Sequence, residues 1–319
     1  MVNMRLDHAP LDDQWDRLVD NSPNGSIFCK SFYLRSLSTK VGTYYCFKNR
    51  EIYGLVVVPE SDCAKTSKDN EFLIYSGILF RKPSPNQNQS QIYSERLEVA
   101  AFVASELDRR YLKVILRLHP SVDDLRAFLW HNYECGRQYK LDLRYTTYLD
   151  ISKLRDEGEL SFQSNFSSSR RQEIRKFNRS NLTLDMTPSL DIFSSLFKKT
   201  FARQGVDIDP RSISEMVAIV TSLLEMGSCK VFNIYDEREN IVSSAIFGLD
   251  SKMAYYLYGA SDPEFRSTSC GTAVIWSAIK YFSEMGLNTI DLEGVNSPRR
   301  GWFKLSFGGV LRPYFEISL

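Results

Sequence analysis

The stretch Lys230-Val-Phe-Asn-Ile-Tyr235 is mostly apolar and aromatic, and it begins the pattern of strands from which the fold of this chain is predicted. The polar turn 236–240 and the apolar run Ile241 to Leu249 follow it, which is the pattern of a β-hairpin. Beyond the hairpin the sequence predicts a third strand, a helix and a last apolar strand, at Ala254 to Tyr258, about Gly271 to Met285, and Thr289 to Glu293. A helix between two strands lets them lie parallel, whereas a hairpin is antiparallel, so we expect a mixed sheet.

The same order of elements occurs once before in the chain. The earlier copy has two hairpin strands, a third strand, a helix and a closing strand, at Thr43 to Lys48, Ile52 to Pro59, Phe72 to Phe80, about Ser94 to Arg110, and Lys113 to Arg117. We therefore predict an α+β fold of two tandem domains, each with a mixed central sheet flanked by helices. The boundary is expected near Arg144, which gives an N-terminal domain at 1–144 and a C-terminal domain at 145–319.

Length, charge and composition restrict the class of protein. The 319 residues suffice for two domains, and 40 Lys and Arg residues face 39 Asp and Glu residues, which excludes a protein that coats DNA through overall positive charge. No apolar stretch reaches the roughly 18 residues of a membrane span, and the N-terminus does not resemble a secretory signal. We therefore expect no transmembrane segment and a cytoplasmic location. The six cysteines are scattered and the histidines are only three, so we expect neither a disulfide framework nor a metal site.

The segment between the two copies contains a basic helix. The sequence predicts a strand at Tyr145 to Ile151, followed by helices at Leu160 to Asn178, Asp191 to Ala202, and Ser212 to Leu224. In the first of these helices, Arg171, Arg175 and Arg179 recur at every fourth position and so form one cationic stripe. Guanidinium groups in a row suit phosphate, and we predict that Arg171, Arg175 and Lys176 bind the phosphates of a donor. A solvated helix face is the alternative.

Two tyrosines follow in the third strand of the second copy. Strict alternation places Tyr256 and Tyr258 on one face of the strand, so their phenols can point together into a cleft. Phenols there can hold a substrate or donate a proton to a leaving group. Structural tyrosines on the surface of a sheet are the alternative.

The C-terminal run Asp291 to Gly309 contains a lone lysine in an aromatic and glycine-rich setting. Acids leave the end of an apolar strand, a turn with Arg299 and Arg300 follows, and Lys304 comes after Phe303. A lysine with apolar neighbours can stabilise a developing oxyanion, whereas a lysine that extends along the surface into solvent is the alternative. Arg299 is a further candidate contact for an anionic substrate.

The duplicated unit, the basic helix, the tyrosine strand and the Phe303-Lys304 ending together resemble the Fem family of aminoacyl transferases. The motifs that carry this resemblance are Asn21 to Phe28, Val114 to Pro120, Leu149 to Lys153, Ser168 to Arg179, Arg203 to Gly205, Tyr256 to Ser261, and Phe303-Lys304. The resemblance implies two domains of the GNAT acyltransferase fold. It also implies transfer of an amino acid from its ester on tRNA to an amine of a peptidoglycan precursor or a similar acceptor.

The resemblance assigns roles to several residues. Lys304, with Phe303 beside it, would stabilise the tetrahedral oxyanion, and Tyr258 would contact the acceptor. Where the family often has Arg-x-Asp-Pro, this chain has Arg117-Leu-His-Pro120, so His119 would act as a base or as a hydrogen-bonding partner. Asp209 and Ile213 stand where family members carry the arginine and tyrosine that grip a nucleotide diphosphate, which disfavours a UDP-linked acceptor.

The donor is left open between aminoacyl-tRNA and acyl-CoA. GNAT enzymes that use acyl-CoA bind its pyrophosphate at a Q/R-x-x-G-x-G/A turn, which corresponds here to Arg266 to Ala273. Arg266 and Gly271 are therefore candidate donor contacts, although a serine replaces the first glycine and Cys270 precedes Gly271. No tightly bound cofactor is expected with either donor.

These features together predict an acyl or aminoacyl transferase that forms an amide on an amine of a cell-envelope peptide or glycan precursor. The partners are then an amine-bearing peptide or sugar, and tRNA held by a local basic patch. The first alternative is an acyl-CoA-dependent N-acyltransferase that acts on an amino sugar or sugar nucleotide. The second is a non-catalytic binding protein that keeps the fold without the chemistry.

Overall fold

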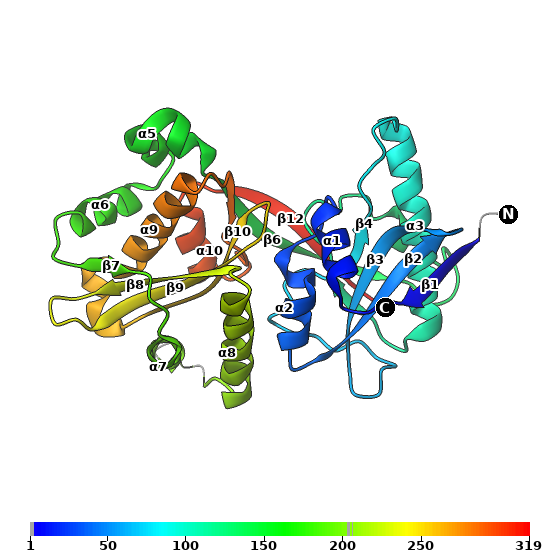
Figure 1. Cartoon of the computed structure of the whole chain (residues 1–319), viewed down its shortest axis with the longest axis horizontal. Helices are drawn as coiled ribbons and strands as arrows, with labels where there is room; N and C mark the ends of the chain where they lie inside the picture. Colours follow the sequence, from blue (N-terminus) through cyan, green and yellow to red (C-terminus); the bar gives the residue numbers. More distant parts are fainter. Residues whose placement is uncertain (1–2, 203–204, 206) are drawn as a thin grey trace. The chain divides into compact units, whose positions relative to one another are not determined.

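The structure is a computed structural model that describes residues 3–202, 205 and 207–319, apart from the side chains of residues 266 and 267 (Figure 1). The chain divides into two units, Met1–Arg144 with Pro313–Leu319, and Tyr145–Arg312. The end of the chain therefore belongs to the first unit, and our expectation that 313–319 lies with the C-terminal domain is wrong. The reason is that β12 (Val310–Ser318) pairs antiparallel with β5 (Ile115–Arg117) of the first unit.

The first unit is built on an antiparallel sheet of order β1-β2-β3-β4. Its strands are β1 (Met4–His8), β2 (Lys40–Lys48), β3 (Glu51–Glu60) and β4 (Gly77–Phe80). The long helix α3 (Gln89–Arg110) buries Val99, Val103 and Leu107 in the same core as strand residues Val56 and Ile78. The shorter helices are α1 (Asp13–Asn21), η1 (Ile27–Cys29), α2 (Ser31–Ser36) and α4 (Arg126–Leu129).

A capping box explains why α3 begins earlier than the apolar spacing predicts. Asn88 accepts a hydrogen bond from the Gln91 N–H at 3.0 Å, and the Gln91 side chain accepts one from the Asn88 N–H at 2.9 Å. These two bonds satisfy backbone donors that a helix start leaves unpaired. The helix therefore starts within a polar stretch that carries no apolar periodicity.

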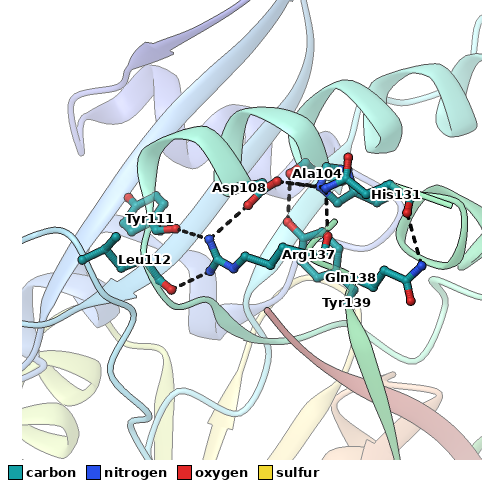
Figure 2. Close-up of polar contacts among 9 residues, drawn as sticks. Ala104, Asp108, Tyr111, Leu112, His131, Arg137, Gln138 and Tyr139 are labelled. Carbon is teal, nitrogen blue, oxygen red and sulfur yellow. Dashed lines mark hydrogen bonds and ion pairs between the residues drawn. The ribbon is translucent and has the colours of Figure 1, made fainter. Parts of the chain in front are cut away.

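The C-terminal end of α3 is fixed by a cluster of polar contacts (Figure 2). Asp108 accepts hydrogen bonds from His131 at 2.9 Å and from Arg137 at 3.0 Å. The Arg137 guanidinium also donates to the carbonyls of Tyr111 at 3.0 Å and Leu112 at 2.6 Å. The partners of Asp108 hold its pKa below the usual value, against the effect of burial. Every charged group drawn in this cluster thus has a partner.

The second unit contains the mixed sheet. Its strands follow the order β6-β11-β10-β9-β8-β7, and β10 and β11 are parallel whereas the other pairs are antiparallel. Their bounds are β6 (Lys140–Asp150), β7 (Thr183–Asp185), β8 (Cys229–Tyr235), β9 (Ile241–Leu249), β10 (Ala254–Ser261) and β11 (Thr289–Asp291).

Helices cover both faces of this sheet. The helices α6 (Ser168–Phe177) and α9 (Cys270–Glu284) lie on one face, and α7 (Leu190–Ala202) and α8 (Pro210–Glu225) lie on the other (Figure 1). The remaining helices are α5 (Ser152–Ser164), η2 (Pro263–Thr268) and α10 (Pro298–Leu305). On the α9 face, Trp276 and Phe282 are fully buried and belong to one apolar core with Phe247 of β9.

The single helix predicted at Leu160 to Asn178 is wrong, because two helices occupy this segment. The chain leaves α5 at Asn165, buries Phe166 in the core, and starts α6 at Ser167, whose hydroxyl accepts from the Arg170 N–H at 3.3 Å. A serine is a favourable N-cap, so the start of a new helix is encoded locally. None of the helices in the described part of the chain is long and apolar enough to cross a bilayer.

Candidate active site

The short helix α10 positions Lys304 in its last turn. Pro298 stands at the start of the helix, where its missing N–H costs nothing, and Gly308 ends the turn that follows with a φ of 77°. A Cβ on Gly308 would lie 2.7 Å from the Asn165 carbonyl oxygen, so this close approach needs glycine. Phe303 packs against Phe307 with ring centres 5.4 Å apart and so anchors α10 to the core beneath it.

The Lys304 ammonium lies in an apolar and acidic environment. Its Nζ is 5.2 Å from the ring centre of Tyr256 on β10. Burial, with a smaller contribution from the charge of Arg300, lowers the pKa of Lys304 to about 8, although Glu293 and Asp291 act to raise it. Lys304 is therefore largely protonated at neutral pH, yet close to its titration. A partly desolvated ammonium of this kind interacts strongly with negative charge that develops beside it.

Two carboxylates lie near Lys304 at the end of β11. Asp291 is fully buried and accepts from the Thr146 hydroxyl and, at 2.8 Å, from the Glu293 N–H. The Glu293 side chain is 5% exposed, and its Oε1 has no hydrogen-bond partner among the described residues. Burial and the charge of Asp291 raise the pKa of Glu293 well above its ordinary value, while Lys304 lowers it. No ion pair or hydrogen bond joins Lys304 to Glu293 in the described structure.

Asp291 and Glu293 are not among the site residues predicted from the sequence. The signal was the acidic pair at the end of an apolar strand, directly before Gly294. The sequence pattern does not reveal that these carboxylates are buried. Their burial depends on contacts with β6, where the Leu292 N–H donates to the Thr147 carbonyl and the Val295 N–H donates to the Tyr145 carbonyl.

The two tyrosines of β10 do not share a face, and the alternation on which we based that prediction is interrupted. Tyr256 pairs with Phe247 and Tyr258 with Ile246, so a bulge between them shifts the register by one residue. Tyr256 packs on Phe247 at 5.1 Å in the α9-side core, whereas Tyr258 contacts Phe197 of α7 at 6.3 Å. The structure thus brings Tyr256, but not Tyr258, to Lys304.

Of the predicted arginine stripe, Arg171 and Arg175 lie on α6, whereas Arg179 lies in the turn after its C-cap Asn178. Ile174 of α6 is buried, as the spacing predicts. A groove of about 600 Å³ is lined by Arg175, Lys176 and Arg179 together with Gln172 and Ser180. Arg171 does not line this groove, and its guanidinium donates to the Ser164 carbonyl at 3.1 Å. Three cationic side chains around one groove favour the binding of a phosphate-bearing group.

The neighbouring Arg170 points inward and connects α6 to α9 and α10. Its guanidinium bonds to Glu173 and to the Thr272 hydroxyl in the first turn of α9, and that hydroxyl donates to Glu173. It also lies 4.9 Å above the ring of Phe303. A carboxylate, Glu173, therefore already contacts the first turn of the helix in which Gly271 was predicted to meet a donor.

The other predicted contacts are scattered. Arg299 is exposed on α10, and the side chain of Arg266 and the residues Arg203 and Gln204 lie outside the described structure.

His119 lies in the first unit, where it is 7% exposed, stacks edge-on with Tyr75 at 5.1 Å, and has its Nδ1 2.8 Å from the Ser121 hydroxyl. The residues around Lys304 described above all belong to the second unit. Over the described residues, no group of His, Cys, Asp and Glu side chains has the arrangement of a metal site.

Comparison with known families matches part of this site, because the matched range ends before Phe303 and Lys304. Residues 164–299 match the GNAT acetyltransferase domain, which covers α6, the groove, β10, α9 and both carboxylates. Curated proteins provide no match to the sequence.

Solved structures with the same fold cover both units. FemX is 17% identical with a TM-score of 0.67, and the alignment covers 98% of this chain and 96% of FemX. A tandem GNAT protein from the clavulanic acid biosynthesis pathway is 9% identical with a TM-score of 0.54, over 99% of this chain and 98% of that one. The C-terminal domain of a putative lysylphosphatidylglycerol synthetase from Agrobacterium fabrum is 11% identical with a TM-score of 0.53, over 96% and 90% of the two chains. The tandem GNAT-like fold is therefore confirmed, and the resemblance to the Fem type is supported by the domain match and by these neighbours.

Proposed function

We propose that this chain, whose second unit contains a GNAT acetyltransferase domain, is an aminoacyl transferase that forms an amide on an amine of a cell-envelope peptide or glycan precursor. The observation that carries the proposal is the half-buried ammonium of Lys304, held over Tyr256 beside two buried carboxylates. The names of two structural neighbours, FemX and a putative lysylphosphatidylglycerol synthetase, support aminoacyl rather than acetyl transfer.

In the proposed reaction, the amine nitrogen attacks the carbonyl carbon of the donor ester. Lys304 stabilises the oxyanion of the tetrahedral intermediate, and Phe303 keeps α10 in place by packing on Phe307. Collapse of the intermediate breaks the ester bond and releases the donor hydroxyl. The chain supplies position and charge, so no covalent enzyme intermediate is needed.

Two observations favour aminoacyl-tRNA over acyl-CoA as the donor. The groove of Arg175, Lys176 and Arg179 suits a phosphodiester backbone. The first turn of α9, where a CoA pyrophosphate would lie in GNAT enzymes, already contacts the carboxylate of Glu173, which disfavours a second anion. A tRNA donor also places the reaction in the cytoplasm.

Replacement of Lys304 tests the chemistry. We expect Lys304→Ala to lower turnover on the order of 100- to 1000-fold, because one stabiliser of the oxyanion is lost. Lys199→Ala is the matched control, because Lys199 on α7 pairs with Asp262, and this change should leave turnover within about twofold. Near-full turnover of Lys304→Ala with aminoacyl-tRNA and an amine acceptor would falsify the proposed mechanism.

The pH profile gives a second measure of Lys304. The ammonium is the active form, so transfer should decline as pH rises through about 8. Lys304→Arg keeps a positive charge over this range and should lack that decline. An unchanged alkaline limb in the arginine variant would assign the titration to another group.

Donor binding separates the proposal from its acyl-CoA alternative. A donor that binds only the folded protein raises the thermal midpoint with its concentration, so aminoacyl-tRNA should stabilise the chain and acyl-CoA should not. Removing Arg175 or Arg179 should weaken tRNA binding and reduce its salt dependence by about one phosphate contact each. Stabilisation by CoA alone would favour the N-acyltransferase alternative, and saturable binding without turnover would favour a binding protein.

A further inference from the structure

Glu293 is a buried carboxylate that the oxyanion chemistry leaves unused. Its side chain is 5% exposed and its Oε1 has no hydrogen-bond partner in the described part of the chain. An unpaired charge in such a position is costly, and buried polar groups of folded proteins normally have partners. A group that lacks a partner in the free protein is available to one that arrives with a ligand.

The backbone holds Glu293 in a conformation that a glutamate adopts only under constraint. Its φ is 54°, in the left-handed region that disfavours residues with a Cβ. The Glu293 N–H bonds to Asp291 at 2.8 Å, and the residues on either side are tied to β6 by the Leu292 and Val295 amides. Strain that the surrounding structure imposes in this way is concentrated at functional sites.

The groups around Glu293 define what can bind there. Asp291 on β11 and Lys304 on α10 lie beside Glu293. Lys304 in turn lies beside Arg300 and over the ring of Tyr256, and Asp291 pairs with Tyr148 of β6, whose phenol oxygen is buried and has no partner among the described residues. The Oε1 of Glu293 is an acceptor that lacks a hydrogen-bond donor among the described residues. A primary amine, which is an ammonium ion at neutral pH, has the charge opposite to that of the Glu293 carboxylate and can donate to this open Oε1.

We propose that Glu293 binds the acceptor as a primary ammonium ion and takes the proton that the amine must lose before it attacks the donor. This role rests on the proposed function. The N–H bond to one proton breaks and the Glu293 carboxylate becomes a carboxylic acid. The freed electron pair of nitrogen forms the new C–N bond, and the electrons of the carbonyl double bond move to the oxygen beside Lys304. On collapse, the ester C–O bond breaks and the leaving oxygen takes the second amine proton.

Turnover measured against pH tests the catalytic part of this inference. Loss of a positioned base should lower kcat/KM for transfer from aminoacyl-tRNA about 100-fold or more in Glu293→Gln, with tRNA binding unchanged. Glu293→Asp, which keeps the carboxylate, should retain more turnover than Glu293→Gln, and the acid limb of the profile should be present in Glu293→Asp and absent in Glu293→Gln. Glu284→Gln, at the exposed end of α9, is the matched control. Full turnover of Glu293→Gln, together with loss of turnover in Lys304→Ala, would overturn the role of Glu293 and leave the proposed function standing.

An NMR titration without any donor tests the ammonium site even if the wild-type protein shows no transfer and the proposed function is wrong. In protein labelled with 13C-lysine, the NMR signal of Lys304, assigned by its absence in Lys304→Ala, reports its titration. We expect the pKa of Lys304 to fall in Glu293→Gln, because a carboxylate that raises it is gone. Addition of 1,5-diaminopentane should shift the wild-type titration in the same direction and leave Glu293→Gln unchanged. If the pKa of Lys304 in the wild type does not change when 1,5-diaminopentane is added, the proposed binding of an ammonium ion at Glu293 is wrong.

Discussion

In the first unit, Glu316 accepts from Arg117 and Arg144 at 2.9 Å each, and Asp108 accepts from His131 and Arg137, whereas in the second unit the Oε1 of Glu293 has no hydrogen-bond partner among the described residues. The pKa values move accordingly. Those of Glu316 and Asp108 are lowered by their partners, and that of Glu293 is raised by burial and by Asp291. Glu293 therefore differs from these two carboxylates of the first unit, and also from Asp262 of the second unit, whose pKa is lowered by its partner Lys199.

The contrast between the paired carboxylates and Glu293 indicates which part of a duplicated fold can bind a ligand. Paired carboxylates stabilise the folded state and have little capacity left for a ligand. An unpaired buried carboxylate destabilises the folded state and keeps its capacity for a ligand. The first unit shows the properties of a scaffold and the second those of a site, and substitutions that change stability in opposite directions can test this contrast.

The largest effect on stability is expected from Glu316→Ala. The change leaves the guanidinium of Arg117, whose side chain is 13% exposed, with Asp69 as its remaining ion-pair partner among the described residues, and it removes the ion-pair partner of Arg144. Removal of one member of a largely buried ion pair should lower the free energy of unfolding by about 3 kcal/mol. Chemical denaturation measures it, and Glu316→Gln, which keeps an acceptor, should lose less. An unchanged midpoint would mean that the network contributes nothing.

A smaller loss is expected from Asp108→Asn. The charge that His131 and Arg137 share disappears, and hydrogen bonds to a charged group contribute on the order of 1.5 kcal/mol. The folded pKa of Asp108 is lowered, so its contribution is present above about pH 4 and fades as pH falls through the lowered value. Denaturation at pH 7 and below pH 3 measures both, with the exposed Asp142→Asn as control. Equal losses at the two pH values would contradict the electrostatic origin.

Local patterns predicted those parts of the fold that local interactions determine. The helix predicted at about Gly271 to Met285 is α9 at Cys270–Glu284, because apolar residues at helical spacing fill one core. The pairing of β1 with β2 and of β12 with β5 joins segments far apart in sequence, which no periodicity records. The pairing of β12 with β5 is the reason that 313–319 belongs to the first unit.

The candidate site was predictable to a similar extent. Phe303 and Lys304 stand out by residue type and by a family resemblance, and Tyr256 by its strand. The bulge after Tyr256 is not visible as a break in the sequence pattern, although Gly259 gives room to the Tyr256 phenol where a Cβ would clash with it. Glu293 resembles a solvated strand end until the contacts of its neighbours with β6 bury it.

Glu293→Gln should change stability in the direction opposite to Asp108→Asn. A neutral amide of the same shape removes a buried charge, while the bond from the Glu293 backbone N–H to Asp291 remains. We expect the free energy of unfolding to rise by about 1 kcal/mol at neutral pH, since exchange of a costly buried charge for a neutral group is commonly stabilising. Because turnover is expected to fall in the same variant, a gain in both stability and activity would contradict a functional role.

The pH dependence of that gain is the smallest effect and the most specific one. A carboxyl group whose folded pKa is raised favours the folded state when protonated, so wild-type stability should decrease as pH rises from about 4.5 toward the raised value. Glu293→Gln lacks this decrease, and the difference between the two proteins should be near zero at pH 4 and grow as pH rises. The positive charge of Lys304 offsets part of it, so Lys304→Ala should enlarge the wild-type decrease. A difference that is constant from pH 4 to pH 8 would mean that the carboxyl finds a partner in solution, and the contrast between the two units would then be lost.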